Sequence, residues 1–134
     1  MKYFTYLFVA LVCLAIGRWT SPAMAQAQEP AFTNAEVKNL FKRALDENYT
    51  PGREVLVDRV EVPPNTTLDR HWHPGEEFHY YLKGEPFVAL RNEQARQVKE
   101  GTVGHVPFKA EHVLSTKEKG TTLIVFRVHT AGQP

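Results

Sequence analysis

Short runs of apolar residues, broken by turn residues, fill the chain from Arg53 onward. In REVLVDRVEV, valines stand at positions 55, 57, 60 and 62, and Pro63-Pro64-Asn65 ends the run. Further runs rich in β-branched and aromatic residues follow at residues 78–82, 86–90, 95–99, 102–106, 111–116 and 121–130. About seven or eight short strands at this spacing predict an all-β, antiparallel sandwich or barrel.

Residues 33–45 carry a different pattern, which favours a helix. Thr33 and Glu36 have the spacing of a capping box, and apolar residues follow at helical spacing. These apolar positions are Val37, Leu40, Phe41, Ala44 and Leu45. We therefore predict one short amphipathic helix that ends before Pro51-Gly52 and packs across a sheet edge or against a partner subunit.

The first 25 residues have the pattern of a secretory signal peptide. Lys2 gives a weakly positive start, residues 7–17 (LFVALVCLAIG) are apolar throughout, and Ala23-Met24-Ala25 is a small-x-small cleavage site. The apolar run is too short to span a hydrocarbon layer of about 30 Å. We expect a periplasmic or secreted mature chain from Gln26, with a flexible lead-in and the helix over residues 26–52 and the main domain over residues 53–130.

Charge and cysteine content exclude several classes of function. The chain has 16 basic and 15 acidic residues, and cleavage would remove Lys2 and Arg18 and no acid, which leaves 14 against 15. Nothing in this balance indicates a nucleic-acid surface or, after cleavage, a membrane-binding patch. The single cysteine, Cys13, lies in the leader, so disulfides and thiolate sites are excluded from the mature chain. A metal would have to be bound by His, Asp and Glu.

The stretch DRHWHPGEEFHYYLKGE, residues 69–85, gathers groups that bind metals or transfer protons. His71 and His73 are two apart, so on a strand both would point to one face. The turn at residues 74–76 would then let Glu77 point back toward the two imidazoles, with a further ligand from a neighbouring strand. Glu76 is the alternative carboxylate, although the spacing favours Glu77.

The wider spacing identifies a family resemblance. The chain reads His71-x-His73-x3-Glu77-x6-Gly84 and, sixteen residues later, Gly101-x5-Pro107-x4-His112. These segments resemble the two motifs of the cupin superfamily, and the resemblance extends from Arg53 to Val128. It is closest to small single-domain cupins with a quercetin-dioxygenase-like metal site. The resemblance implies a small β-barrel, or jelly roll, in which His71, His73, Glu77 and His112 bind one divalent transition metal ion. In this family the ion is usually iron or manganese and sometimes nickel, copper or zinc.

Three positions depart from the cupin motifs. Asn65 and Lys109 stand where the motifs have glycine, and Thr116 stands where the second motif ends in asparagine. Asparagine tolerates a left-handed backbone, so the first change is mild. Lys109 puts the shape of the turn before His112 in doubt. None of the three removes a predicted ligand.

Several residues around the predicted ligands have more than one possible role. Strand alternation places His79 and Tyr81 on the same face as Glu77, as candidate pocket or catalytic residues, with a buried hydrogen-bonded role equally open. Glu77 could also leave the metal and act as a base. His105 could point inward or outward, and we expect His129 on the surface. We expect four aromatic residues in the core, namely Phe78, Tyr80, Phe87 and Phe126.

The resemblance implies two functions of different classes. The first is a mononuclear-metal enzyme of dioxygenase-like type that acts on a small organic compound, because four protein ligands leave positions open on a six-coordinate ion. The alternative is a non-catalytic periplasmic protein that binds a metal or a small ligand. In either case we expect a small-molecule partner, and a homodimer with the predicted helix as its contact.

Overall fold

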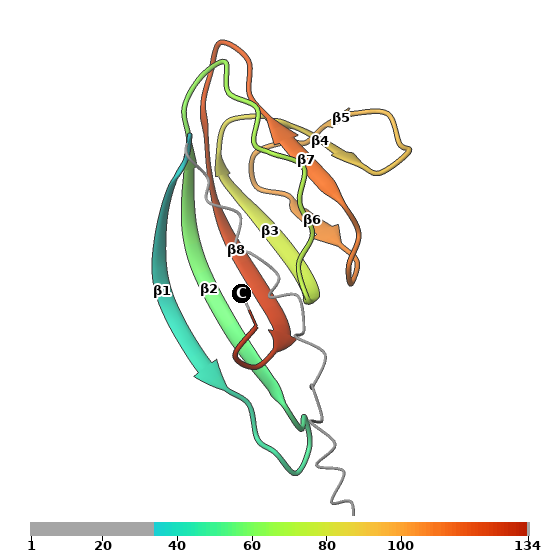
Figure 1. The fold of residues 1–134 in the computed structure, drawn as a ribbon. Coiled ribbons are helices and arrows are strands. Elements are labelled where there is room, and N and C mark those ends of the chain that lie inside the picture. Colours follow the sequence, from blue (N-terminus) through green and yellow to red (C-terminus); the bar gives the residue numbers. More distant parts are fainter. Residues whose placement is uncertain (1–33, 134) are drawn as a thin grey trace, which may run out of the picture.

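The computed structural model describes residues 34–133, which form eight antiparallel strands in two sheets (Figure 1). The predicted signal peptide and the lead-in up to residue 33 lie outside the described residues. The larger sheet has the order β1-β2-β8-β3-β6, and the smaller sheet has the order β5-β4-β7. The strands are β1 (Glu36–Ala44), β2 (Arg53–Val62), β3 (Gly75–Lys83), β4 (Phe87–Leu90), β5 (Arg96–Gln97), β6 (Val103–Val106), β7 (His112–Ser115) and β8 (Thr121–Thr130).

This architecture confirms the predicted all-β, antiparallel fold. Each run predicted as a strand from Arg53 onward overlaps one of the strands β2 to β8. In Figure 1 the long strands β1, β2, β8 and β3 lie side by side as one curved layer, and the smaller sheet lies across from β3. None of the described segments within residues 34–133 forms a helix with the length and hydropathy needed to cross a membrane.

The predicted helix at residues 33–45 is wrong, because Glu36–Ala44 is the edge strand β1. Val37 lies opposite Val60 of β2, whereas the register shifts between Asn39 and Phe41. A bulge adds one residue to the period of two, so the apolar residues on either side of it fall three or four apart. That spacing is the same as the spacing of a helical face.

The core lies between the two sheets and follows from strand alternation. Residues on the inner faces of β2, β3 and β8 alternate with more exposed ones along each strand. The buried apolar cluster consists of Val60, Val62, Leu68, Tyr81, Val88, Leu114, Leu123 and Val125. The inner faces of β2, β3 and β8 also hold polar residues, among them Asp58, Glu77, His79 and Arg127, and these form the site described below.

The aromatic residues on the outer face of the larger sheet correct another expectation. Phe78, Tyr80 and Phe126 are exposed rather than in the core, at 37%, 45% and 40%. Alternation explains the difference, because their neighbours Glu77, His79 and Arg127 point inward. Phe87 of β4 is half-buried.

At two turns, the residue that stands in place of the motif glycine adopts the backbone conformation of glycine. Asn65 has φ 52° and Lys109 has φ 57°, so both adopt the left-handed conformation that glycine would adopt. Gly75 is required for lack of space rather than for its backbone conformation, because a Cβ atom there would collide with the Val128 carbonyl oxygen on β8. β3 begins at this glycine, two residues before Glu77.

Candidate metal centre

Backbone pairing places two of the predicted ligands side by side. His71 and His112 form an isolated antiparallel bridge, in which each backbone N–H donates to the carbonyl of the other at 3.1 and 2.9 Å. Their ring centroids are 4.2 Å apart, and the His73 ring is 4.9 Å from His71 and 5.5 Å from His112. The three imidazoles therefore converge although the sequence separates His112 from the others by about forty residues.

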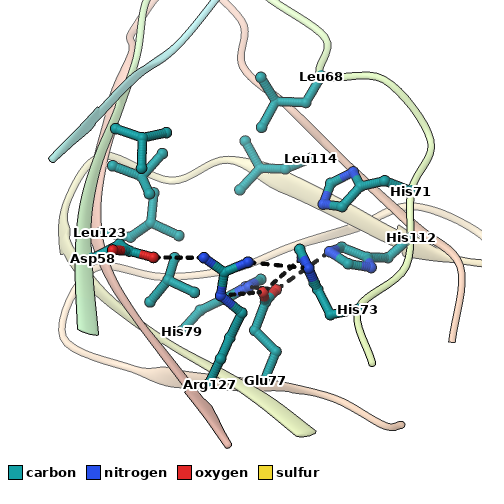
Figure 2. A pocket seen from close by; sticks show the side chains of 13 residues that line it. Asp58, Leu68, His71, His73, Glu77, His79, His112, Leu114, Leu123 and Arg127 are labelled. Carbon is teal, nitrogen blue, oxygen red and sulfur yellow. Dashed lines mark hydrogen bonds and ion pairs between the residues drawn. The ribbon is translucent and has the colours of Figure 1, made fainter. Parts of the chain in front are cut away.

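Glu77 joins these imidazoles from β3 (Figure 2). Its Oε2 is 2.8 Å from His73 Nε2, and its Oε1 is 3.3 Å from His112 Nε2. The residue is only 3% exposed. The structure thus brings all four predicted ligands, His71, His73, Glu77 and His112, to one place inside the barrel.

His79 and Tyr81 also point inward, as strand alternation predicted. Both are buried, and His79 Nε2 contacts Glu77 Oε1 directly. On the other side of the ring, His79 Nδ1 is 3.1 Å from the Tyr81 hydroxyl. Glu77, His79 and Tyr81 therefore form a hydrogen-bonded series along the inner face of β3.

Backbone carbonyls fix the protonation of two imidazoles. His71 Nδ1 is 2.7 Å from the Asp69 carbonyl oxygen, and His112 Nδ1 is 3.2 Å from the Ala110 carbonyl oxygen. A carbonyl oxygen only accepts, so in each neutral ring the proton is on Nδ1 and Nε2 has a lone pair. This is the tautomer that a ligand binding through Nε2 requires, and a carbonyl that accepts from the opposite ring nitrogen is typical of metal-binding histidines.

His73 is held differently, by a residue that the sequence did not indicate. Arg127 Nη1 is 3.1 Å from His73 Nδ1, and a guanidinium only donates. The neutral His73 ring therefore accepts at Nδ1 and donates from Nε2 to Glu77. A metal bound at His73 Nε2 would displace that proton, so the contact between Arg127 and His73 must adjust when the ion binds.

Arg127 and Asp58 form a buried ion pair behind the imidazoles (Figure 2). Arg127 Nη2 donates to Asp58 Oδ2 at 2.6 Å, and Asn39 of β1 donates to Asp58 Oδ1 at 2.7 Å. Arg127 Nε is also 3.9 Å from Glu77 Oε2. The predicted site omitted both charged residues, although alternation along β2 and β8 places each on an inner face.

The electrostatics suit a bound cation. Burial by itself would raise the pKa of Glu77, but the charge of His79 and the hydrogen bond from His73 lower that pKa well below its ordinary range. Burial, together with the nearby His112, lowers the pKa of His71 to about 4. At neutral pH the site therefore presents an ionised carboxylate and a neutral His71, which are the forms that bind a metal.

The remaining candidates lie away from this centre. Glu76 is on the outer face, where it contacts His105 Nε2 at 2.6 Å, so both residues point outward. His129 is fully buried, which contradicts the expected surface position. Its partner there is Glu54 on β2, at 3.1 Å. Continuing the alternation of β8 past Arg127 would have placed His129 inside.

An antiparallel barrel whose interior gathers three histidines and one glutamate from two motifs defines a class of small β-barrel proteins with residues that could hold a metal ion. Consistent with this class, residues 58–128 match the family model of the cupin domain. The match spans more than half of the chain, and the chain belongs to this family. No curated protein is detectably similar to the chain in sequence.

Solved structures share the fold at low sequence identity. A cupin-like protein from Thermotoga maritima has a TM-score of 0.59 and 23% identity, over 81% of this chain and 85% of that one. KdgF from Halomonas sp. has a TM-score of 0.57 and 16% identity, over 75% and 84%. The DMSP lyase DddQ from Ruegeria pomeroyi has a TM-score of 0.57 and 20% identity, over 60% of this chain. The aligned part is 41% of that lyase, so the chain spans less than half of its length.

Proposed function

We propose that this protein is an exported cupin that binds one divalent transition metal ion and acts on a small organic substrate. The observation that carries the proposal is the convergence of His71, His73, Glu77 and His112, with His71 and His112 held in the tautomer whose Nε2 carries the lone pair that binds a metal. Imidazole and carboxylate ligands suit iron, manganese, nickel, copper or zinc. Export is proposed from the leader sequence.

The residues around the donors would prepare the site for a small ligand. The pocket that contains the donors is also lined by aliphatic side chains, including Leu68, Leu114 and Leu123, which would exclude water (Figure 2). Asp58 balances the charge of Arg127, so the Glu77 carboxylate remains to balance a cation. When bound there, an ion would supply Lewis-acid or redox chemistry and bind a substrate oxygen.

Among reaction types we propose a dioxygenase-like oxidation, with Glu77 as the base that would accept a proton from the substrate. His79 and Tyr81, which continue from Glu77 as a hydrogen-bonded series, are the other candidate catalytic residues. One similar structure is a DMSP lyase, so a lyase reaction without oxygen is a distinct outcome of the same test.

A non-catalytic binding protein is the second candidate. Its support is that Glu77 already contacts His73, His79 and His112, so the carboxylate is held by protein groups on several sides. A carboxylate held in this way would keep a metal in place, while a catalytic base must be able to move.

The test begins with chelator-treated protein reloaded with Fe²⁺, Mn²⁺, Ni²⁺, Cu²⁺ or Zn²⁺. By elemental analysis we expect one metal ion per chain in the wild type and a much lower metal content in the His112→Ala variant. Oxygen uptake and product formation are then measured with enediols, flavonols and small carboxylates. Turnover in the wild type and none in His112→Ala would support the enzyme. Tight binding of one ion without conversion would support the binding protein, whereas equal metal content in both proteins would contradict the site.

A further inference from the structure

His79 is not part of the four-ligand set, yet it lies beside two of its members, Glu77 and His112. The potential donor atoms fall into two overlapping groups, one of His71, His73 and His112 and one of Glu77, His79 and His112. Within each group the donor atoms lie within 4.8 Å of one another. Donors about 2.1 Å from one ion are up to ~4.2 Å apart across it. Both groups are thus close to the size of a coordination sphere, and they share His112.

His79 lies almost as near to His112 as the predicted ligand His73 does, although His79 shares no donor group with His71 and His73. The ring centroids of His79 and His112 are 6.2 Å apart, compared with 5.5 Å for His73 and His112. His79 Nε2 contacts Glu77 Oε1, the same oxygen that is 3.3 Å from His112 Nε2. His79 is 4% exposed, so protein rather than solvent surrounds this nitrogen.

The other nitrogen of His79 has a partner that permits ligation. His79 Nδ1 faces the hydroxyl of Tyr81, and a hydroxyl can either donate or accept. If the proton moved to Nδ1, with the hydroxyl accepting it, His79 Nε2 would present a lone pair to an ion in place of its hydrogen bond to Glu77. Gly104, opposite His79 on β6, leaves room for this hydroxyl, because a Cβ there would lie 3.1 Å from it.

We propose that His79 Nε2 is a fifth protein donor of the metal centre. The inference rests on the proposed function, since it requires an ion bound by His71, His73, Glu77 and His112. It also narrows that function. Five protein donors on a six-coordinate ion leave one position, so a substrate would bind the metal through a single atom rather than as a chelate.

The test counts metal-bound imidazoles directly. The whole chain, with ¹⁵N-labelled histidine, is loaded with ¹¹³Cd²⁺, and scalar coupling between ¹¹³Cd and ¹⁵N identifies each bound ring nitrogen by NMR. We expect four coupled histidines in the wild type and three in His79→Phe. His105 and His129 serve as internal controls that show no coupling. Tyr81→Phe is the matched variant, because it removes only the hydroxyl and should keep four couplings.

The outcomes separate this inference from the proposed function. Coupling of His71, His73 and His112 without His79 in the wild type would overturn the fifth donor and leave the metal site intact. Absence of coupling from every histidine would overturn the metal site and the fifth donor together. The number of coupled histidines in the wild type tests the fifth donor even where His79→Phe does not fold. His79→Gln then serves to assign the fourth signal.

Discussion

The inner face of the larger sheet has two buried clusters of glutamate and histidine, one around Glu77 and one around Glu54. Glu54 Oε1 accepts from His129 Nε2 at 3.1 Å, from Lys42 Nζ at 3.2 Å and from the Gly132 backbone N–H at 3.1 Å. Each of these neighbours donates a hydrogen bond to the carboxylate. Glu77 also lies among imidazoles, but the carbonyl partners of His71 and His112 turn lone pairs toward the site.

This difference shows that a buried contact between histidine and glutamate does not by itself indicate a metal. In the Glu54 cluster, protein donors already satisfy the carboxylate. The cluster connects β1, β2, β8 and the residues after β8. The Glu77 cluster brings ring nitrogens with lone pairs together, an arrangement that a cation would stabilise. We therefore expect substitutions at the Glu77 cluster to weaken metal binding and substitutions at the Glu54 cluster to leave it unchanged.

The largest expected difference concerns stabilisation by metal. With Zn²⁺ at a thousand times its Kd, binding to the folded state should add about 4 kcal/mol to the free energy of unfolding of the wild type. His112→Ala should lose this increment, while His129→Gln should keep it despite a lower starting stability. Thermal unfolding with and without Zn²⁺ measures both. Equal loss in the two variants would remove the distinction between the clusters.

The next effect concerns the ion pair behind the Glu77 cluster. Asp58→Asn leaves the Arg127 guanidinium buried without that carboxylate, which should cost about 3 kcal/mol of unfolding free energy. It should also weaken metal binding, because the guanidinium charge near Glu77 is no longer balanced. Urea unfolding of the metal-free protein and calorimetric titration with Zn²⁺ test the two effects. The matched control is Glu61→Gln on the exposed side of β2, and an equal change there would contradict the role of Asp58.

A smaller effect is expected from the Glu54 cluster. Burial by itself would raise the pKa of Glu54, but the Gly132 N–H and Lys42 lower it below its ordinary value. A lowered carboxyl pKa stabilises the fold above the ordinary value of 4.5, and this contribution is lost as the pH falls through the folded-state pKa. Glu54→Gln should cost about 1–2 kcal/mol at pH 7 and should reduce the loss of stability on acidification. Zn²⁺ affinity should not change. Unfolding curves between pH 7 and pH 3 measure the effect, and an unaltered acid profile would show that Glu54 does not cause it.

The features of the fold and of the site that depend on local sequence pattern could be predicted from the sequence. The strands from Arg53 onward, the ligand spacing and the inward positions of His79 and Tyr81 all follow from alternation or from motifs. The helix at residues 33–45 failed because the bulge in β1 produces helical spacing. The roles of Asp58, Arg127 and His129 depend on the pairing of β2 with β8, and their contacts join residues far apart in the chain. Which nitrogen of His73 carries its proton depends in turn on Arg127.

The smallest predicted effect concerns the turn that supports the Glu77 cluster. Lys109 has φ 57°, and its backbone N–H donates to the His73 carbonyl at 3.2 Å, whereas its ammonium lies over Trp72 and Phe108. Lys109→Gly and Lys109→Ala both remove the ammonium, but only glycine adopts this conformation without steric cost. The glycine variant should therefore be more stable than the alanine variant by about 1 kcal/mol, measured by urea unfolding, and both should bind Zn²⁺ as the wild type does. Equal stability would mean that the backbone at Lys109 leaves the left-handed region in solution, and the carbonyl of His73 would then lose its support from this turn.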